Sequence, residues 1–155
     1  MKLNLGCAKN HLDGFINIDI DRDCLPDLVL DLGNEKLPFE DNSVDMVVSN
    51  HFLEHLSMDE TVHLIKEIYR VCRVGATISF CCPHYLSPVA YMIGHKQRIG
   101  ENYFQGWEDM FDISYKMSFM RYRPKRKGML RILPFLGIIP CNIIFTLVKK
   151  EKRIK

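Results

Sequence analysis

The sequence predicts an α/β domain built on an open, mostly parallel, doubly wound sheet. Short apolar runs recur along the first half of the chain and are separated by turns. The clearest amphipathic segment lies between two of these runs, and polar residues follow the ends of several of them. Strands that alternate with helices and turns favour a parallel sheet, whose ligands bind at the carboxyl ends of the strands.

Five apolar runs predict the strands of the first half: residues 3–5, 15–19, 28–30, 44–49 and 76–82. The run at 44–49 is nearly continuous in apolar residues, which is typical of a strand covered on both faces. Residues 59–71 carry apolar side chains at steps of three and four, and they predict a helix that Asp59 caps and Gly75 ends.

The second half is less regular. Residues 85–99 predict a helix or a lid, residues 107–111 the start of a short helix, and residues 115–122 a strand. A basic connection covers residues 121–128, and the β-rich run at 142–149 predicts the last strand.

Length and composition predict a single globular domain. The 155 residues are enough for one core, and 47% hydrophobic with 26% charged residues is an ordinary globular mixture. Six scattered cysteines show no C-x-x-C spacing, and the N-terminal sequence has no secretory pattern. We therefore expect a cytoplasmic protein with reduced thiols instead of a disulfide framework.

The net charge of +2 hides an asymmetry. Residues 1–60 hold 4 Lys+Arg against 13 Asp+Glu, a net of −9, and residues 61–155 hold 17 against 6, a net of +11. Residues 121–155 contain 11 basic residues and one acid. This basic end predicts either an anionic partner or a solvated tail, and contact with a membrane surface through residues 121–148 is one form of the first alternative.

Residues 132–148 form a run of 17 residues without a charge, which is the short limit for a membrane span. Pro134, Gly137 and Pro140 argue against one continuous helix. An interfacial segment and simple core packing are the alternatives, and core packing is the interpretation that we favour.

A glycine and several polar residues follow the predicted strands. Gly6 ends the first run, Asp19 the second and Asp31 the third, and Asn50 and His51 follow the fourth. Because the carboxyl ends of parallel strands meet at one edge of a sheet, the sequence predicts a ligand site there. The alternative is that the acids are only turn residues, since Asp is common in loops.

Residues 51–55 match H-x-x-E-H, an inverted zinc-peptidase motif. That motif needs both histidines on one helix face and a further ligand downstream. Here it directly follows a strand, and no helix-borne acid stands out as a third ligand. We therefore expect no metal site, and we expect Glu54 and His55 to orient the turn or to lie on the surface.

Six short motifs follow one another in the first half: Leu-Asn-Leu-Gly-Cys at 3–7, Gly-Phe-Ile-Asn-Ile-Asp at 14–19, Asp-Leu at 31–32, Leu-Pro-Phe-Glu-Asp-Asn-Ser-Val-Asp at 37–45, His-Phe-Leu-Glu-His-Leu at 51–56 and Arg-Val-Cys-Arg-Val-Gly at 70–75. In this order and spacing they resemble the class I S-adenosylmethionine-dependent methyltransferases of the type 11-like subgroup, in which the first crossover is shortened. The resemblance implies a Rossmann-like methyltransferase fold with an antiparallel last strand, and S-adenosyl-L-methionine as cofactor.

The resemblance also implies a set of cofactor-binding residues. Asp19 would accept hydrogen bonds from both ribose hydroxyls, a task that suits an acceptor-only carboxylate. The other predicted contacts are the backbone around Gly6 and Ala8 for the methionine part, Asp31 and the backbone of Leu32 for the adenine, Ile20 beside Asp19, and Asn50 and His51 near the reacting methyl. Ala8 stands where the family usually has glycine, which would cost about 1 kcal/mol if its φ is positive.

The implied reaction is methyl transfer to an oxygen or nitrogen nucleophile of a small or glycan-like acceptor. His84 and His51 are the predicted catalytic residues; His84 could be a general base near neutral pH or a loop histidine without chemistry. Residues 84–141 would form an acceptor-side or lid insertion within a single domain over residues 1–155. We do not expect a nucleic-acid acceptor, since no Asn/Asp-Pro-Pro-Tyr motif follows the fourth strand.

Two other functional classes stay open at this point. The departure at Ala8 is compatible with a cofactor-binding module without catalysis. The basic C-terminal segment is compatible with a protein that binds an anion or a membrane surface.

Overall fold

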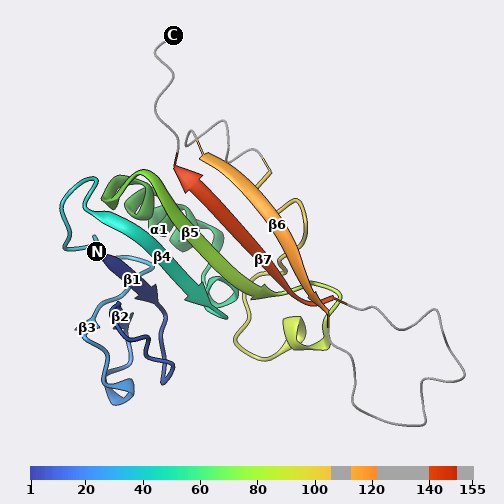
Figure 1. Cartoon of the computed structure of the whole chain (residues 1–155). Coiled ribbons are helices and arrows are strands. Elements are labelled where there is room, and N and C mark those ends of the chain that lie inside the picture. The colour runs from blue at the N-terminus through green and yellow to red at the C-terminus, as the bar shows by residue number, and fades with distance from the viewer. Residues whose placement is uncertain (106–112, 122–139, 150–155) are drawn as a thin grey trace, which may run out of the picture.

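The computed structural model describes residues 1–105, 113–121 and 140–149. One seven-stranded sheet organises them, with strand order β3-β2-β1-β4-β5-β7-β6 (Figure 1). The strands are β1 Lys2–Leu5, β2 Ile16–Asp19, β3 Leu28–Val29, β4 Val44–Asn50, β5 Cys72–Pro83, β6 Ile113–Arg121 and β7 Pro140–Lys149. All seven predicted strands are confirmed, with shifts of a few residues at their ends.

The order of the strands places a topological switch at the centre of the sheet. β1 pairs in parallel with both β2 and β4, so the chain first runs outward to β3 and then crosses to the other side of β1. β7 runs antiparallel to β5 and to β6, which confirms the antiparallel last strand. Ligands of such sheets bind beside the carboxyl ends of the strands at the switch.

Helix α1 (Met58–Val71) connects β4 to β5. Ser57 caps it, accepting a hydrogen bond from the amide of Glu60 while the Glu60 side chain accepts one from the amide of Ser57. The prediction that Asp59 caps this helix is therefore wrong, because the capping-box pair is Ser57 and Glu60.

The predicted end of the helix at Gly75 is also wrong. The helix ends at Val71, and β5 begins at once because the buried Cys72 pairs with Val44. The register then shifts, so that Met46 pairs with Thr77. Gly75 lies in this irregularity with φ +81°, and its role is to form a bulge near the start of the strand.

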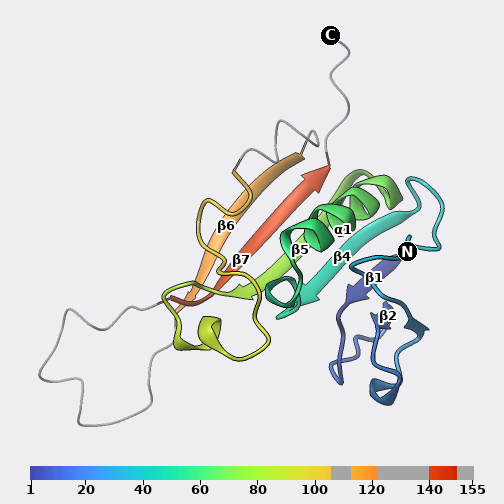
Figure 2. The ribbon, with the colours of Figure 1, turned by 180° about the vertical axis from the view of Figure 1, so that it is seen from behind.

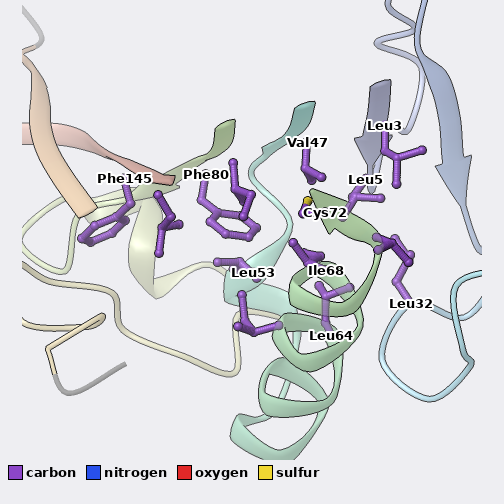
Figure 3. Close-up of a cluster of buried hydrophobic side chains, with 14 of the residues drawn as sticks. Leu3, Leu5, Leu32, Val47, Leu53, Leu64, Ile68, Cys72, Phe80 and Phe145 are labelled. Carbon is purple, nitrogen blue, oxygen red and sulfur yellow. The ribbon is translucent and has the colours of Figure 1, made fainter. Parts of the chain in front are cut away.

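The core lies between α1 and one face of the sheet. Figure 3 shows Leu64 and Ile68 of the helix directed toward Val47 and Leu5 of the strands. Figure 2 shows α1 in front of the strands, on the face that is turned away in Figure 1. Phe80 and Phe104 extend this core toward β7, with ring centroids 5.7 Å apart.

The strands bury one face more deeply than the other. Along β5, Ile78, Phe80 and Cys82 are buried, whereas the alternate residues Thr77 and Ser79 are half-buried. In β4, the same difference leaves Met46 and Val48 half-buried. The expectation that β4 is covered on both faces is therefore not met, because the described helix packs on only one of them.

The segment after β5 contains turns and one short 3-10 helix, η3 (Pro88–Tyr91), in place of the α-helix that residues 85–99 could have formed. The predictions for residues 107–111 and for the basic connection after Arg121 lie outside the described residues, as do residues 132–139 of the charge-free run at 132–148. The rest of that run lies in strand β7. No helix in the described ranges is both long enough and apolar enough to cross a membrane.

Candidate functional site at the carboxyl edge

The predicted site residues lie where the parallel strands end. Asp19 is the last residue of β2, Gly6 follows β1 directly, and Asn50 is the last residue of β4. The arrowheads of β1 and β4 point toward the same edge of the sheet in Figure 1. The structure therefore brings these three positions, from separate parts of the sequence, to one edge.

Asp19 joins two of these strand ends. Its Oδ2 accepts a hydrogen bond of 2.8 Å from the amide of Ala8, and its Oδ1 accepts one of 3.0 Å from the amide of Asp21. The side chain is half-buried, and each carboxylate oxygen can accept a second hydrogen bond. Asp19 thus fixes the turn after β1 and still has acceptor capacity for a ligand.

The turn after β1 is strained. Gly6 has φ +62° and Ala8 has φ +43°, so the positive φ considered for Ala8 is present. Gly6 is also required for packing, because a Cβ built there would lie 2.4 Å from the ring of Phe52. The glycine therefore admits Phe52 against the backbone, a role in addition to the predicted approach of a ligand.

A polar network replaces the helix that a longer first crossover would contain. Asn4 Nδ2 donates to Asn17 Oδ1 and to the carbonyl of Asn10, both at 2.9 Å. Asn17 in turn donates to Asp27 through its amide at 2.7 Å and its side chain at 2.8 Å, and accepts from the amide of Leu12. These hydrogen bonds from Asn17, backbone first, lower the pKa of Asp27. The loop between β1 and β2 is held by these contacts, which the sequence analysis did not identify.

The third strand end is organised as a turn around Asp31. Its Oδ1 accepts from the amide of Gly33 and its Oδ2 from Asn34 Nδ2, each at 3.0 Å. The Leu32 side chain is buried in the core, so only its backbone can contact a ligand. Ile20, in contrast, is 62% exposed beside Asp19, which leaves an apolar surface at the site.

His51 occupies an unusual conformation just after β4. Its φ is +54°, and its Nδ1 lies 3.2 Å from Oε1 of the buried Glu54. Contacts with the Cys81 side chain first, and then with Glu54, raise the pKa of His51 to about 10. This environment stabilises the imidazolium form.

His84 is fully buried and both of its ring nitrogens are engaged. Nδ1 accepts from the amide of Leu86 at 3.2 Å, and Nε2 lies 3.1 Å from Glu101 Oε1. Of the two interpretations made from the sequence, these contacts favour the one in which His84 holds its loop without taking part in chemistry.

The cysteines of this region are poor nucleophiles. Burial, more than any charge, raises the pKa of Cys7 to about 11 and that of Cys82 well above its ordinary value. Cys82 is buried, whereas its neighbour Cys81 is half-buried. No thiol chemistry is indicated by these two pKa shifts.

Comparisons with known proteins agree with the fold just described. Residues 16–80 match the family model described as a methyltransferase domain. A SAM-dependent methyltransferase from Archaeoglobus fulgidus superposes with a TM-score of 0.78 at 16% identity, covering 96% of this chain and 85% of that one. The described part of the chain therefore has the fold of the SAM-dependent methyltransferases, and residues 16–80 match the family model of their domain.

Two further structures support the methyltransferase fold. A putative methyltransferase in complex with the Trm112 methyltransferase activator of Haloferax volcanii gives a TM-score of 0.73 at 14% identity, over 99% of this chain and 83% of that one. A SAM-dependent methyltransferase from Methanosarcina mazei gives 0.67 at 15% identity, over 97% and 92%. No curated protein matches the chain.

The methyltransferase cofactor is S-adenosylmethionine, and the residues at the carboxyl edge fit it. Asp19 offers acceptors for ribose hydroxyls, and the exposed Ile20 offers an apolar contact for a planar ring. The tight turn at Gly6 and the last residue of β4, Asn50, lie at the same edge of the sheet. When bound, the cofactor supplies an electrophilic methyl group on a sulfonium.

Proposed function

We propose that this chain transfers the methyl group of S-adenosylmethionine to an oxygen or nitrogen nucleophile of a small or glycan-like acceptor. The observation that carries the proposal is the Asp19 carboxylate, which ties the turn after β1 to the tip of β2 and keeps lone pairs for a ligand. The predicted binding roles follow from this anchor. Asp31 and the Leu32 backbone bind the adenine, and Asn50 and His51 flank the methionine part.

Positioning is the main contribution of the protein to this reaction. An in-line arrangement of donor and acceptor lowers a barrier by several kcal/mol, so a dedicated catalytic group is not required for transfer to a reactive nucleophile. We propose that His51 orients the ligands at the end of β4. His84 supports the loop on which acceptor contacts lie, because both its ring nitrogens are already engaged.

The acceptor side of the site carries exposed aromatic and apolar side chains. Tyr91 is 61% exposed and stacks under the Arg98 guanidinium at 4.8 Å, and Tyr85 and Met92 are also exposed. Aromatic faces of this kind suit the apolar faces of sugar rings, and the tyrosine hydroxyls suit the sugar hydroxyls. In this proposal, residues 84–141 form the acceptor side of a single domain over residues 1–155.

A transfer assay with methyl-labelled S-adenosylmethionine tests this function. We expect label in one class of sugar or nucleotide-sugar acceptor, a loss of transfer in Asp19→Asn, and a fall in kcat/KM of about tenfold or more in Tyr91→Ala. The exposed Leu25, in the turn between β2 and β3, is not among the proposed contacts and provides the control Leu25→Ala. Label found only in nucleic acid or protein would contradict the acceptor class.

A second candidate function is cofactor binding without turnover. The left-handed conformation of Ala8 favours it, because strain beside the ligand weakens the site. Binding of S-adenosylhomocysteine without label transfer to any acceptor in the panel would favour this candidate. Transfer to any acceptor, including the protein itself, would rule it out.

A further inference from the structure

Three metal-ligating side chains converge beside the end of β4. Glu54 and His55 belong to the short 3-10 helix η2 (Leu53–His55), and His95 lies forty residues further along the chain. One ligand atom from each of the three side chains lies within 4.8 Å of the other two. The rings of His55 and His95 are 4.7 Å apart and nearly perpendicular, at 88°.

Backbone and side-chain hydrogen bonds hold the two segments together. The carbonyl of Glu54 accepts from the amides of Lys96 at 2.7 Å and Gln97 at 3.1 Å. Gln97 Nε2 also donates to the carbonyl of Leu56 and to Thr61 Oγ1, each at 2.8 Å. Figures 1 and 2 both show the segment after β5 folded back beside the turn that follows β4. The convergence of the three side chains is therefore built into the fold.

The cluster leaves buried polar atoms unsatisfied. Glu54 is 1% exposed; its Oε1 lies 3.2 Å from His51 Nδ1, whereas its Oε2 has no hydrogen-bond partner within the described residues. His95 Nδ1 is also buried and has no hydrogen-bond partner in the same described part of the chain. Because burial of unpaired polar atoms is costly, these atoms indicate a missing ligand.

A second contact orients one of the histidines. His55 Nδ1 lies 3.3 Å from the carbonyl of Gly94, and donation to this carbonyl leaves Nε2 with its lone pair. Gly94 has φ +95°, and its backbone lies close to the His55 ring: a Cβ built at Gly94 would be 3.9 Å from His55 Nδ1. Metal-binding histidines commonly have such a backbone acceptor for the other ring nitrogen.

We propose that Glu54, His55 and His95 form a binding site for a divalent first-row transition-metal cation of the Zn²⁺ type. Two imidazole nitrogens and one carboxylate oxygen are a ligand set that Zn²⁺ accepts, with a further position open to water or substrate. Mg²⁺ and Ca²⁺ prefer oxygen ligands, so the two imidazoles disfavour them. The site does not depend on the proposed methyl transfer.

The proposal revises the expectation of no metal that followed from the H-x-x-E-H motif. That motif takes its third ligand from a helix, whereas here His95 comes from a loop. His51, the first histidine of the motif, is not a ligand in this proposal. Its Nδ1 contacts the carboxylate of Glu54, which is one of the proposed ligands.

Calorimetric titration of the chelator-stripped protein with Zn²⁺ tests the site. We expect one Zn²⁺ per chain, much weaker binding of Mg²⁺, and a loss of Zn²⁺ affinity of at least about 100-fold in His95→Ala, more than loss of an outer-shell partner costs. His63→Ala is the matched control, because His63 lies on α1, is not one of the three proposed ligands, and has its Nε2 3.1 Å from the carbonyl oxygen of Glu35. No Zn²⁺ binding by the wild type, or equal binding by His95→Ala and His63→Ala, would overturn the proposal.

A second measurement covers the case in which His95→Ala fails to fold. Zn²⁺ should raise the Tm of the stripped wild-type protein, because a ligand that binds the folded state stabilises it. Glu54→Gln keeps the size of the side chain and should lose this rise. An equal rise of Tm in the wild type and in Glu54→Gln would place the metal elsewhere and overturn the assignment.

Discussion

Ala8 holds a left-handed conformation that residues other than glycine rarely adopt. This conformation costs a non-glycine residue roughly 1–2 kcal/mol, which a glycine at position 8 would not incur. The larger conformational entropy of glycine in the unfolded chain offsets part of that stabilisation. We therefore predict that Ala8→Gly raises the free energy of unfolding by about 0.5 kcal/mol in urea denaturation. Ala76→Gly, a buried strand position, should lower it by about 1 kcal/mol, and stabilisation by both variants would contradict the account.

Gly6 is required both by its φ and by the ring of Phe52. A Cβ at this position would lie 2.4 Å from the ring, so Gly6→Ala should cost about 2 kcal/mol or more of unfolding free energy. Gly14 also has a positive φ but has open space around it, so Gly14→Ala should cost only about 1 kcal/mol. Equal costs for the two variants, measured by denaturant unfolding, would show that the Phe52 contact is unimportant.

Some site residues could be predicted from the sequence because local patterns determine them. Asp19 follows an apolar run, and Ala8 follows a strand and a glycine, so their places at the edge could be predicted. Asn4 and Asn17 could not, because two polar residues inside short apolar runs give no sign that they bond to each other. His95 could not be predicted as a neighbour of His55, because loop contacts over forty residues bring them together.

At the scale of elements, Lys149 of β7 donates hydrogen bonds to backbone carbonyls at the C-terminal end of α1. Its Nζ donates to the carbonyls of Tyr69 and Cys72 and to Asn42 Oδ1, at 2.9, 2.7 and 2.9 Å. Lys149→Met would remove the donor from these acceptors, of which the Cys72 carbonyl is buried, at a cost of about 2 kcal/mol in unfolding free energy. Lys66→Met, on the exposed side of α1, should change stability by less than about 0.5 kcal/mol, and similar losses in both variants would contradict this role.

The start of α1 should make stability depend on pH. The amide of Ser57 first, and then Lys96, lower the pKa of Glu60 to about 2, below its ordinary value of 4.5. A lowered carboxyl pKa stabilises the fold above pH 4.5, and that contribution is lost as the pH falls toward 2. Glu60→Gln should therefore be less stable than the wild type by about 1 kcal/mol at pH 7, and the gap should close near pH 2.

Thermal unfolding of the two proteins across this pH range measures the gap. The effect is specific if Glu40→Gln, at an exposed loop position, shows no comparable change. A gap that stays constant from pH 7 to pH 2 would show that the Glu60 charge is not responsible.

Most elements could be predicted because hydrophobic periodicity defines them. The strands and the helix at 59–71 agree with the structure to within a few residues, apart from the start of β5. The start of β5 was predicted too late because a glycine such as Gly75 commonly ends a helix. The pairing of Cys72 with Val44 instead sets the boundary between α1 and β5. Residues 85–99 lack a clear period, and the structure accordingly shows turns there and a single 3-10 helix.

At the scale of the molecule, the order of strands determines where chemistry can occur. The switch between β1 and β4 brings the turn at Gly6, the Asp19 carboxylate and the end of β4 to one edge. The loop between β1 and β2 reaches this edge without a helix, through the contacts of Asn17. A domain with a short first crossover can therefore still hold the Asp19 carboxylate beside the turn at Gly6.

The most direct test of this account is a calorimetric titration with S-adenosylhomocysteine. We predict micromolar binding by the wild type, binding weakened about tenfold or more in Asp19→Asn, and unchanged binding in Asp13→Asn, an exposed acid of the loop between β1 and β2. Circular dichroism of each variant checks that the fold is retained. Absence of binding by the wild type, or equal affinities for the wild type and Asp19→Asn, would contradict the assignment of the cofactor site to this edge.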